Sequence, residues 1–66
     1  MDIANALKYQ REYLGISKTQ LSKETGISVQ NISRWERNEA LPNIEFCKQL
    51  ANYYGVTIEE LIGAKD

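Results

Sequence analysis

The chain has 66 residues, of which 42% are apolar and 26% are charged, and its net charge is −1. This length allows one small domain, near the lower limit for a core that folds without a staple. With one cysteine and no histidine, the sequence excludes an internal disulfide and a recognisable zinc site. No apolar run approaches the roughly 20 residues that span a bilayer, and no signal peptide opens the chain, so we expect a cytoplasmic protein without membrane contact.

The first predicted helix runs from about Asp2 to Leu14. Ile3, Leu7 and Leu14 fall four and seven positions apart, which places them on one apolar stripe of a helix. Gly15 follows directly, and glycine at this position is typical of a helix C-terminus because it takes left-handed backbone at no steric cost. The pattern predicts an amphipathic helix that ends before Gly15.

Two further helices are predicted from their capping residues. The segment Ser17–Gln20 has the form of a capping box, in which a serine and a glutamine satisfy helix-start amides reciprocally. Gly26 marks a turn, and Ser28 is the natural N-cap of the next helix, which continues to about Arg37. Asn38 stands where glycine or asparagine adopts left-handed backbone after a helix.

The second half of the chain predicts two more helices. Asn43 is the N-cap of the first, Gly55 ends it, and its predicted inward stripe is Ile44, Cys47, Leu50, Ala51 and Tyr54. The last helix is short, with a capping box from Thr57 to Glu60 and Gly63 at its end. Five short amphipathic helices joined by short loops predict a compact all-α domain.

The segment from about residue 18 to residue 37 predicts a helix-turn-helix. Leu21 and Thr25 lie four apart on one helix face, while Ile32 and Trp35 lie three apart on the face of the next helix. Gly26 separates the two helices and allows a tight turn. Such a unit holds its second helix where it can enter the major groove of DNA. Sequence-specific DNA binding is therefore the leading hypothesis.

The distribution of charge follows the same division of the chain. Residues 8–37 carry six basic and three acidic side chains, whereas residues 38–66 carry two basic and five acidic ones. A negative net charge argues against a simple nucleic-acid binder, but the basic half is the half with the helix-turn-helix. The alternative is that a small domain shows this imbalance by chance.

The chain resembles the lambda-repressor-like family, also called XRE or phage Cro/CI-type regulators, from about residue 7 to residue 62. The residues that carry the resemblance are Leu7, Arg11, Leu21, Gly26, Ser28, Ile32, Trp35-Glu36-Arg37, Pro42, Leu50-Ala51, Gly55-Val56 and Leu61. The resemblance implies one five-helix domain over residues 1–66, of a prokaryotic or phage type. It also implies a recognition helix in the third position, and homodimers on near-palindromic operators. The chain departs from the family's common residues at Lys18, Ser22 and Asn38.

The predicted base-reading side chains lie on the first turns of the third helix. Gln30 matches adenine, Arg34 matches guanine, and Val29 offers apolar contact to a thymine methyl group. The alternative for this face is an ordinary solvated helix surface. The base-reading group is Ser28, Val29, Gln30, Asn31, Ser33 and Arg34.

Phosphate contacts are predicted at the periphery, where helix N-termini present unsatisfied N–H groups. The predicted phosphate-binding group is Ser17, Lys18, Lys23, Arg37 and Asn43. For Asn43, a cap without a DNA role is an equal alternative. The resemblance further pairs Arg11 with Glu36 as a structural ion pair, while Trp35 and Cys47 are predicted to be core residues.

Three classes of function can be weighed against the sequence. The first is a DNA-binding transcriptional regulator, expected to act as a repressor on double-stranded DNA. The second is a protein-interaction module on the same fold, which requires an apolar recognition face; the polar side chains of the third helix speak against it. An enzyme is not expected, because the sequence has no histidine, no glycine-rich phosphate loop and no carboxylate pair without a structural role. The sequence indicates no cofactor and no ligand pocket.

Overall fold

The structure, a computed structural model, describes residues 3–63 and is built from helices. The five helices are α1 (Ile3–Tyr13), α2 (Lys18–Thr25), α3 (Val29–Glu36), α4 (Ile44–Tyr54) and α5 (Ile58–Ile62). Within residues 3–63 there is no strand, so the predicted all-α class is confirmed. The predicted start of the first helix at Asp2 lies outside the described residues. None of these helices is long and apolar enough to cross a membrane.

Polar caps set the starts of four helices. In each, the capping side-chain oxygen accepts from the backbone N–H three residues later, at 3.0–3.1 Å; the caps are Ser17, Ser28, Asn43 and Thr57. Thr57 and Glu60 form the predicted capping box. The predicted box at Ser17 is wrong in one half, because the Gln20 side chain donates to Glu24 instead of reaching back. A helical neighbour four residues away competes with the cap for this amide.

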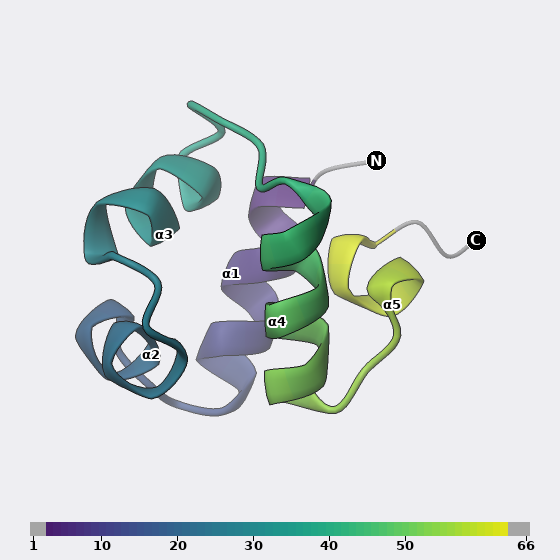
Figure 1. Cartoon of the computed structure of the whole chain (residues 1–66), viewed down its shortest axis with the longest axis horizontal. Helices are drawn as coiled ribbons and strands as arrows, with labels where there is room; N and C mark the ends of the chain where they lie inside the picture. Colours follow the sequence, from purple (N-terminus) through teal and green to yellow (C-terminus); the bar gives the residue numbers. More distant parts are fainter. Residues whose placement is uncertain (1–2, 64–66) are drawn as a thin grey trace.

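The helices are arranged around α1 and α4, which lie in the middle of the molecule (Figure 1). α2 and α3 lie together at one side, and α5 lies at the other side, beyond α4 in this view (Figure 1). α1 packs against both α3 and α5, while α2 packs against α3 and α4. The helix-turn-helix of α2 and α3 therefore packs against α1 and α4, and one side of α3 faces away from the core.

The core gathers one apolar face from every helix. The Trp35 ring of α3 packs against the Phe46 ring of α4 at an interplanar angle of 53°, with ring centroids 5.1 Å apart. Trp35 and Cys47 are buried as predicted, and burial raises the pKa of the Cys47 thiol. The buried cluster consists of Leu7, Leu21, Ile27, Ile32, Trp35, Cys47, Leu50, Ala51 and Leu61.

Two apolar residues predicted to face inward lie on the surface instead. Leu14 is 48% exposed, because α1 ends at Tyr13 and the chain turns away before the stripe continues. Ile44 is 57% exposed, since the first residue of α4 lies beyond the edge of the core. Phe46, which the predicted stripe did not include, packs against that edge in its place.

Tyr53 joins α4 to α2. It falls off the predicted inward stripe of its helix. In the structure it is half-buried, and its hydroxyl donates to the carboxylate of Glu24. This hydrogen bond, together with one from Gln20, lowers the pKa of Glu24. Tyr53 therefore has a role within the chain that does not require a second copy.

Candidate nucleic-acid interface

The two faces of α3 differ in chemistry. Ile32 and Trp35 are buried against α1, α2 and α4, because their spacing of three residues places them on one side of the helix. Gln30 and Arg34, four residues apart, lie exposed on another side. The apolar side chains of α3 thus pack into the core, while its polar side chains face outward.

An open hollow of about 400 Å³ lies along the outer side of α3. It is lined by Val29, Gln30, Asn31, Ser33, Arg34, Arg37 and Glu39. Five of the six predicted base-reading residues are in this lining. The sixth, Ser28, caps the helix at its start, where its oxygen accepts from the Asn31 N–H at 3.1 Å.

A second hollow, of about 260 Å³, separates α3 from the start of α4. Its lining consists of Asn31, Arg34, Trp35, Ala40, Leu41, Asn43 and Phe46. Asn31 and Arg34 line both hollows, so these two side chains lie between them. The fold brings the α4 cap Asn43 to the same hollow, although it follows Arg34 by nine positions in the sequence.

The chain turns back sharply at the end of α3. Asn38 has a φ of 62°, the left-handed backbone that the sequence predicts. The Asn38 N–H donates to the Trp35 carbonyl at 3.2 Å, and the Glu39 N–H donates to the Arg34 carbonyl at 2.8 Å. This pair of hydrogen bonds is the Schellman motif. It brings Glu39 beside Arg37, and Arg37 Nε lies 3.1 Å from Glu39 Oε2.

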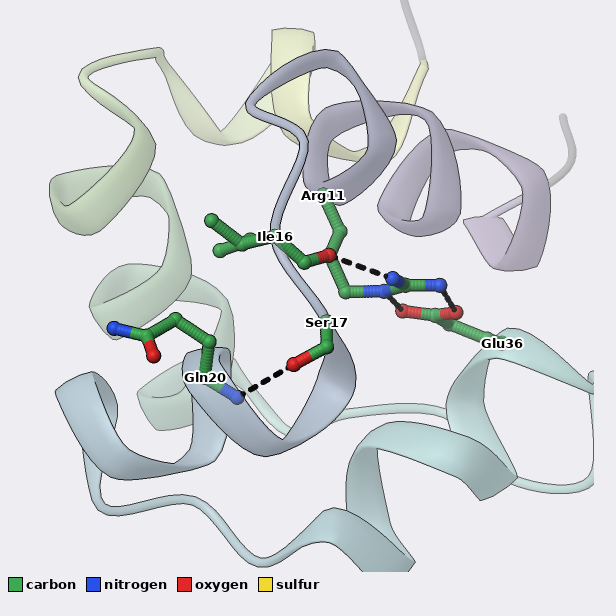
Figure 2. A network of polar contacts seen from close by, with 5 residues as sticks. All are labelled: Arg11, Ile16, Ser17, Gln20 and Glu36. Carbon is green, nitrogen blue, oxygen red and sulfur yellow. Dashed lines mark hydrogen bonds and ion pairs between the residues drawn. The ribbon is translucent and has the colours of Figure 1, made fainter.

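A second arginine–carboxylate pair ties α1 to the end of α3. Arg11 donates from Nε to Glu36 Oε2 at 2.8 Å and from Nη2 to Glu36 Oε1 at 2.9 Å. The two side chains are only 11% and 4% exposed. Figure 2 shows the guanidinium plane and the carboxylate facing each other as a fork. The hydrogen bond from Arg11 to this carboxylate raises the pKa of the guanidinium above its ordinary value, so the guanidinium stays charged.

The same guanidinium also holds the connection between α1 and α2. Arg11 Nη1 donates to the Ile16 carbonyl at 2.9 Å, and Ile16 directly precedes the α2 cap Ser17 (Figure 2). Arg11 therefore fixes the N-terminus of α2 relative to the C-terminus of α3. These are the two helices whose relative position defines a helix-turn-helix.

The predicted phosphate-binding residues lie at four places in the fold. Ser17 and Lys18 lie at the start of α2, where the backbone N–H groups and the helix dipole favour an anion. Asn43 lies at the start of α4, and Arg37 lies at the end of α3. Lys23 is exposed in the last turn of α2. Ser17, Lys18 and Lys23 lie outside the lining of the two hollows, whereas Arg37 and Asn43 are part of it.

Two features of this region were not found from the sequence. Glu39 lies in the hollow beside the base-reading group, and the Ile16 carbonyl accepts from Arg11. Asn38 was the available signal for Glu39, because left-handed backbone after a helix folds the next residue back over the last turn. The sequence gives no signal for Ile16, because every residue has a backbone carbonyl and its residue type does not show which donor it accepts from.

Comparison with known proteins gives a family match over most of the chain. A family model described as "Helix-turn-helix" matches residues 7–61, which contain all five helices except the start of α1 and the end of α5. The chain belongs to this helix-turn-helix family. Its relatives and its five-helix fold place it in the XRE or lambda-repressor-like type.

Three relatives of this helix-turn-helix chain carry the name of a regulator. The "HTH-type transcriptional activator BcrR" of Enterococcus faecalis is 29% identical over all of the chain and 32% of its own length. The "Cryptic phage CTXphi transcriptional repressor RstR" of Vibrio cholerae is 32% identical over 96% of the chain and 56% of its own length.

The third relative, the "Uncharacterized HTH-type transcriptional regulator MJ0272" of Methanocaldococcus jannaschii, is 31% identical over 94% of both chains. The helix-turn-helix chain thus spans about a third of the length of the first relative and about half of the length of the second. It spans nearly all of the third. No solved structure gives a significant match.

Proposed function

We propose that the chain is a sequence-specific DNA-binding regulator that inserts α3 into the major groove of double-stranded DNA. The observation that carries the proposal is the division of α3. Its apolar side is buried, while its other side presents amide and guanidinium groups at the rims of two hollows. These are the groups that pair with base edges in two-point contacts.

Asn31 and Arg34 are the proposed centre of base reading, because both hollows share them. Arg34 matches the two acceptors of guanine, and Gln30 or Asn31 matches the acceptor and donor of adenine. Val29 and Ser33 complete the contact surface, and Ser28 lies at its start. Each good two-point contact supplies about 1–3 kcal/mol of discrimination between bases.

Phosphate contacts at the starts of α2 and α4 would set the register of α3. Ser17 and Asn43 use an oxygen to cap their helices. A serine hydroxyl or an asparagine amide group can still donate to a phosphate. Asn43 thus serves as a cap and as a phosphate contact in this proposal. Lys18, Lys23 and Arg37 add positive charge, which strengthens binding without reading sequence.

Two copies of the chain would occupy one operator. A homodimer with two-fold symmetry reaches half-sites about 10–10.5 bp apart, which requires a near-palindromic site. We expect the protein to act in the cytoplasm and to repress by occupying the operator. Of the named relatives, one is called a repressor and another an activator.

The proposal is tested by selecting bound duplexes from a random DNA pool at about 150 mM salt. Enrichment of a near-palindrome with half-sites one turn apart is the expected result. An Arg34→Ala protein should then lose preference at one base pair per half-site and keep its preference at the others. Lys48→Ala, which removes an exposed charge from α4, is the matched control and should leave the enriched sequence unchanged.

The two failures of this experiment have different meanings. Enrichment of an asymmetric site or of a single half-site would support base reading by α3 and remove the dimer from the proposal. No enrichment, with weak salt-sensitive binding only, would contradict sequence-specific function and favour a protein partner for the same face.

A further inference from the structure

The pair of Arg37 and Glu39 lies at the rim of the base-reading hollow. Both residues line that hollow together with Gln30 and Arg34. Arg37 Nε is 3.1 Å from Glu39 Oε2, and Arg37 Nη2 is 3.4 Å from Glu39 Oε1. Their side chains are 60% and 52% exposed. The proposed phosphate contact of Arg37 is therefore already occupied by a carboxylate of the same chain.

The backbone holds Glu39 in this place. The left-handed turn at Asn38 and the hydrogen bond from the Glu39 N–H to the Arg34 carbonyl fix the residue over the last turn of α3. Because the turn holds Glu39 in this position, its carboxylate already lies beside Arg37 before DNA binds. An exposed pair of this kind is weak, so a phosphate can displace it.

We infer that Glu39 is an internal counter-ion that competes with DNA phosphate for Arg37 and restrains binding that is independent of sequence. This inference rests on the proposed function. A phosphate that approaches Arg37 must either displace the carboxylate or meet a pair with no net charge. The chain carries a net charge of −1, so the number of unpaired cations at the interface decides how strongly it holds arbitrary DNA.

The salt dependence of binding separates a paired arginine from an unpaired one. The logarithm of the binding constant falls against the logarithm of salt concentration by about 0.9 for each neutralised phosphate. An arginine that stays paired with Glu39 contributes little to this slope. Glu39→Gln leaves Arg37 unpaired and should steepen the slope by close to one such contact.

The experiment measures binding of the 66-residue chain to a fluorescent duplex of scrambled sequence, between about 50 and 200 mM salt. The proteins are the wild type, Glu39→Gln, Arg37→Ala, the double variant, and Glu59→Gln. Glu59 is exposed on α5 and its substitution changes the net charge equally, so it controls for charge alone. Thermal melting of each variant checks that it is folded.

We expect Glu39→Gln to tighten binding at the lowest salt about three- to tenfold and to steepen the slope by about 0.9, whereas Glu59→Gln should leave the slope unchanged. Arg37→Ala should weaken binding in the wild type, because it leaves the Glu39 carboxylate without its partner at the interface, and it should abolish the gain in the Glu39→Gln protein. Equal slopes for Glu39→Gln and Glu59→Gln would overturn the inference. A gain that survives in the double variant would also overturn it, because Glu39 would then act on another cation. If the wild type binds no duplex, the proposed function itself fails.

Discussion

The two arginine–carboxylate pairs of this chain use the same chemistry at the C-terminal end of α3. Arg11 and Glu36 are 11% and 4% exposed and form a fork with two hydrogen bonds. Arg37 and Glu39 are 60% and 52% exposed and lie at the rim of the outer hollow. Glu36 and Arg37 are adjacent in the sequence, yet one belongs to the scaffold and the other to the surface.

The two pairs differ in stability because they differ in their exposure to water. A buried charge that loses its partner keeps the whole cost of its desolvation, so the inner pair behaves as one unit. The charges of the outer pair are hydrated and screened, which makes the pair weak and its partners exchangeable. The inner pair is suited to holding helices in place, and the outer pair is suited to meeting a phosphate.

Removing one partner of the inner pair is the largest expected effect. Glu36→Gln leaves the Arg11 guanidinium enclosed without a countercharge and should lower the free energy of unfolding by about 3–5 kcal/mol. The total for a domain of this length is roughly 3–10 kcal/mol, so the variant should be close to unfolded. Urea denaturation followed by circular dichroism measures the change.

Glu39→Gln is the matched control for this prediction, because it makes the same change in an exposed pair. Its free energy of unfolding should stay within about 1 kcal/mol of the wild type. Equal losses in the two variants would contradict the distinction between the pairs.

The two faces of α3 should separate stability from DNA reading. Ile32→Ala removes a buried side chain and should lower the free energy of unfolding by about 2–5 kcal/mol. Arg34→Ala changes an exposed position and should stay within about 0.5 kcal/mol in stability. In a gel-shift or anisotropy assay, Arg34→Ala should lose about 1–3 kcal/mol of preference at one base pair per half-site. A folded Arg34→Ala protein with unchanged preference would remove Arg34 from the base-reading group.

Tyr54 should make the stability of the fold fall at high pH. Burial, with a smaller contribution from the Glu36 carboxylate, raises the pKa of Tyr54 to about 12 from an ordinary value of 10.0. The neutral phenol is thus favoured in the folded state, so its stabilisation is complete below pH 10 and is lost as the pH rises towards 12. Tyr54→Phe should flatten this part of the stability curve in urea titrations. The same alkaline loss in Tyr54→Phe would assign it to another group.

The contact between α2 and α4 should give the smallest effect. The Glu24 carboxylate accepts hydrogen bonds from the Tyr53 hydroxyl of α4 and from the Gln20 side chain of α2, and these hold the pKa of Glu24 below the ordinary 4.5. Any stabilisation from Glu24 is therefore present above that pH and is lost as the pH falls through the lowered value. Tyr53→Phe should raise the pKa of Glu24, as followed by NMR of its carboxyl carbon. An unchanged pKa would mean that Tyr53 does not hold this carboxylate in solution.

Local patterns predicted most of the fold because caps and helix periodicity act over a few residues. Ser28, Asn43 and Thr57 begin helices where their side chains indicate, and Asn38 takes the left-handed backbone expected of it. The failures lie at the edges of elements. Ile44 satisfies the spacing of the inward stripe but stands at the rim of the core, which only the packing of α4 on α3 defines.

The surface around α3 was predictable in its residues but not in its arrangement. The sequence places Gln30 and Arg34 on one side of a helix because the helical period is fixed. It does not show that Asn43 meets Arg34 across a hollow, or that Glu39 pairs with Arg37. Those contacts depend on the angle between helices and on a turn, and both follow from the packing of the whole chain.

The most direct test of α3 as the DNA-reading helix is an NMR titration of the labelled chain with a duplex enriched in the selection. The account predicts the largest amide shifts from Ser28 to Arg34, with further shifts at the starts of α2 and α4. Amides of α5 should change little. Large shifts on α5 or on Tyr9 and Tyr13, the exposed tyrosines of α1, with α3 unchanged, would contradict DNA reading by α3.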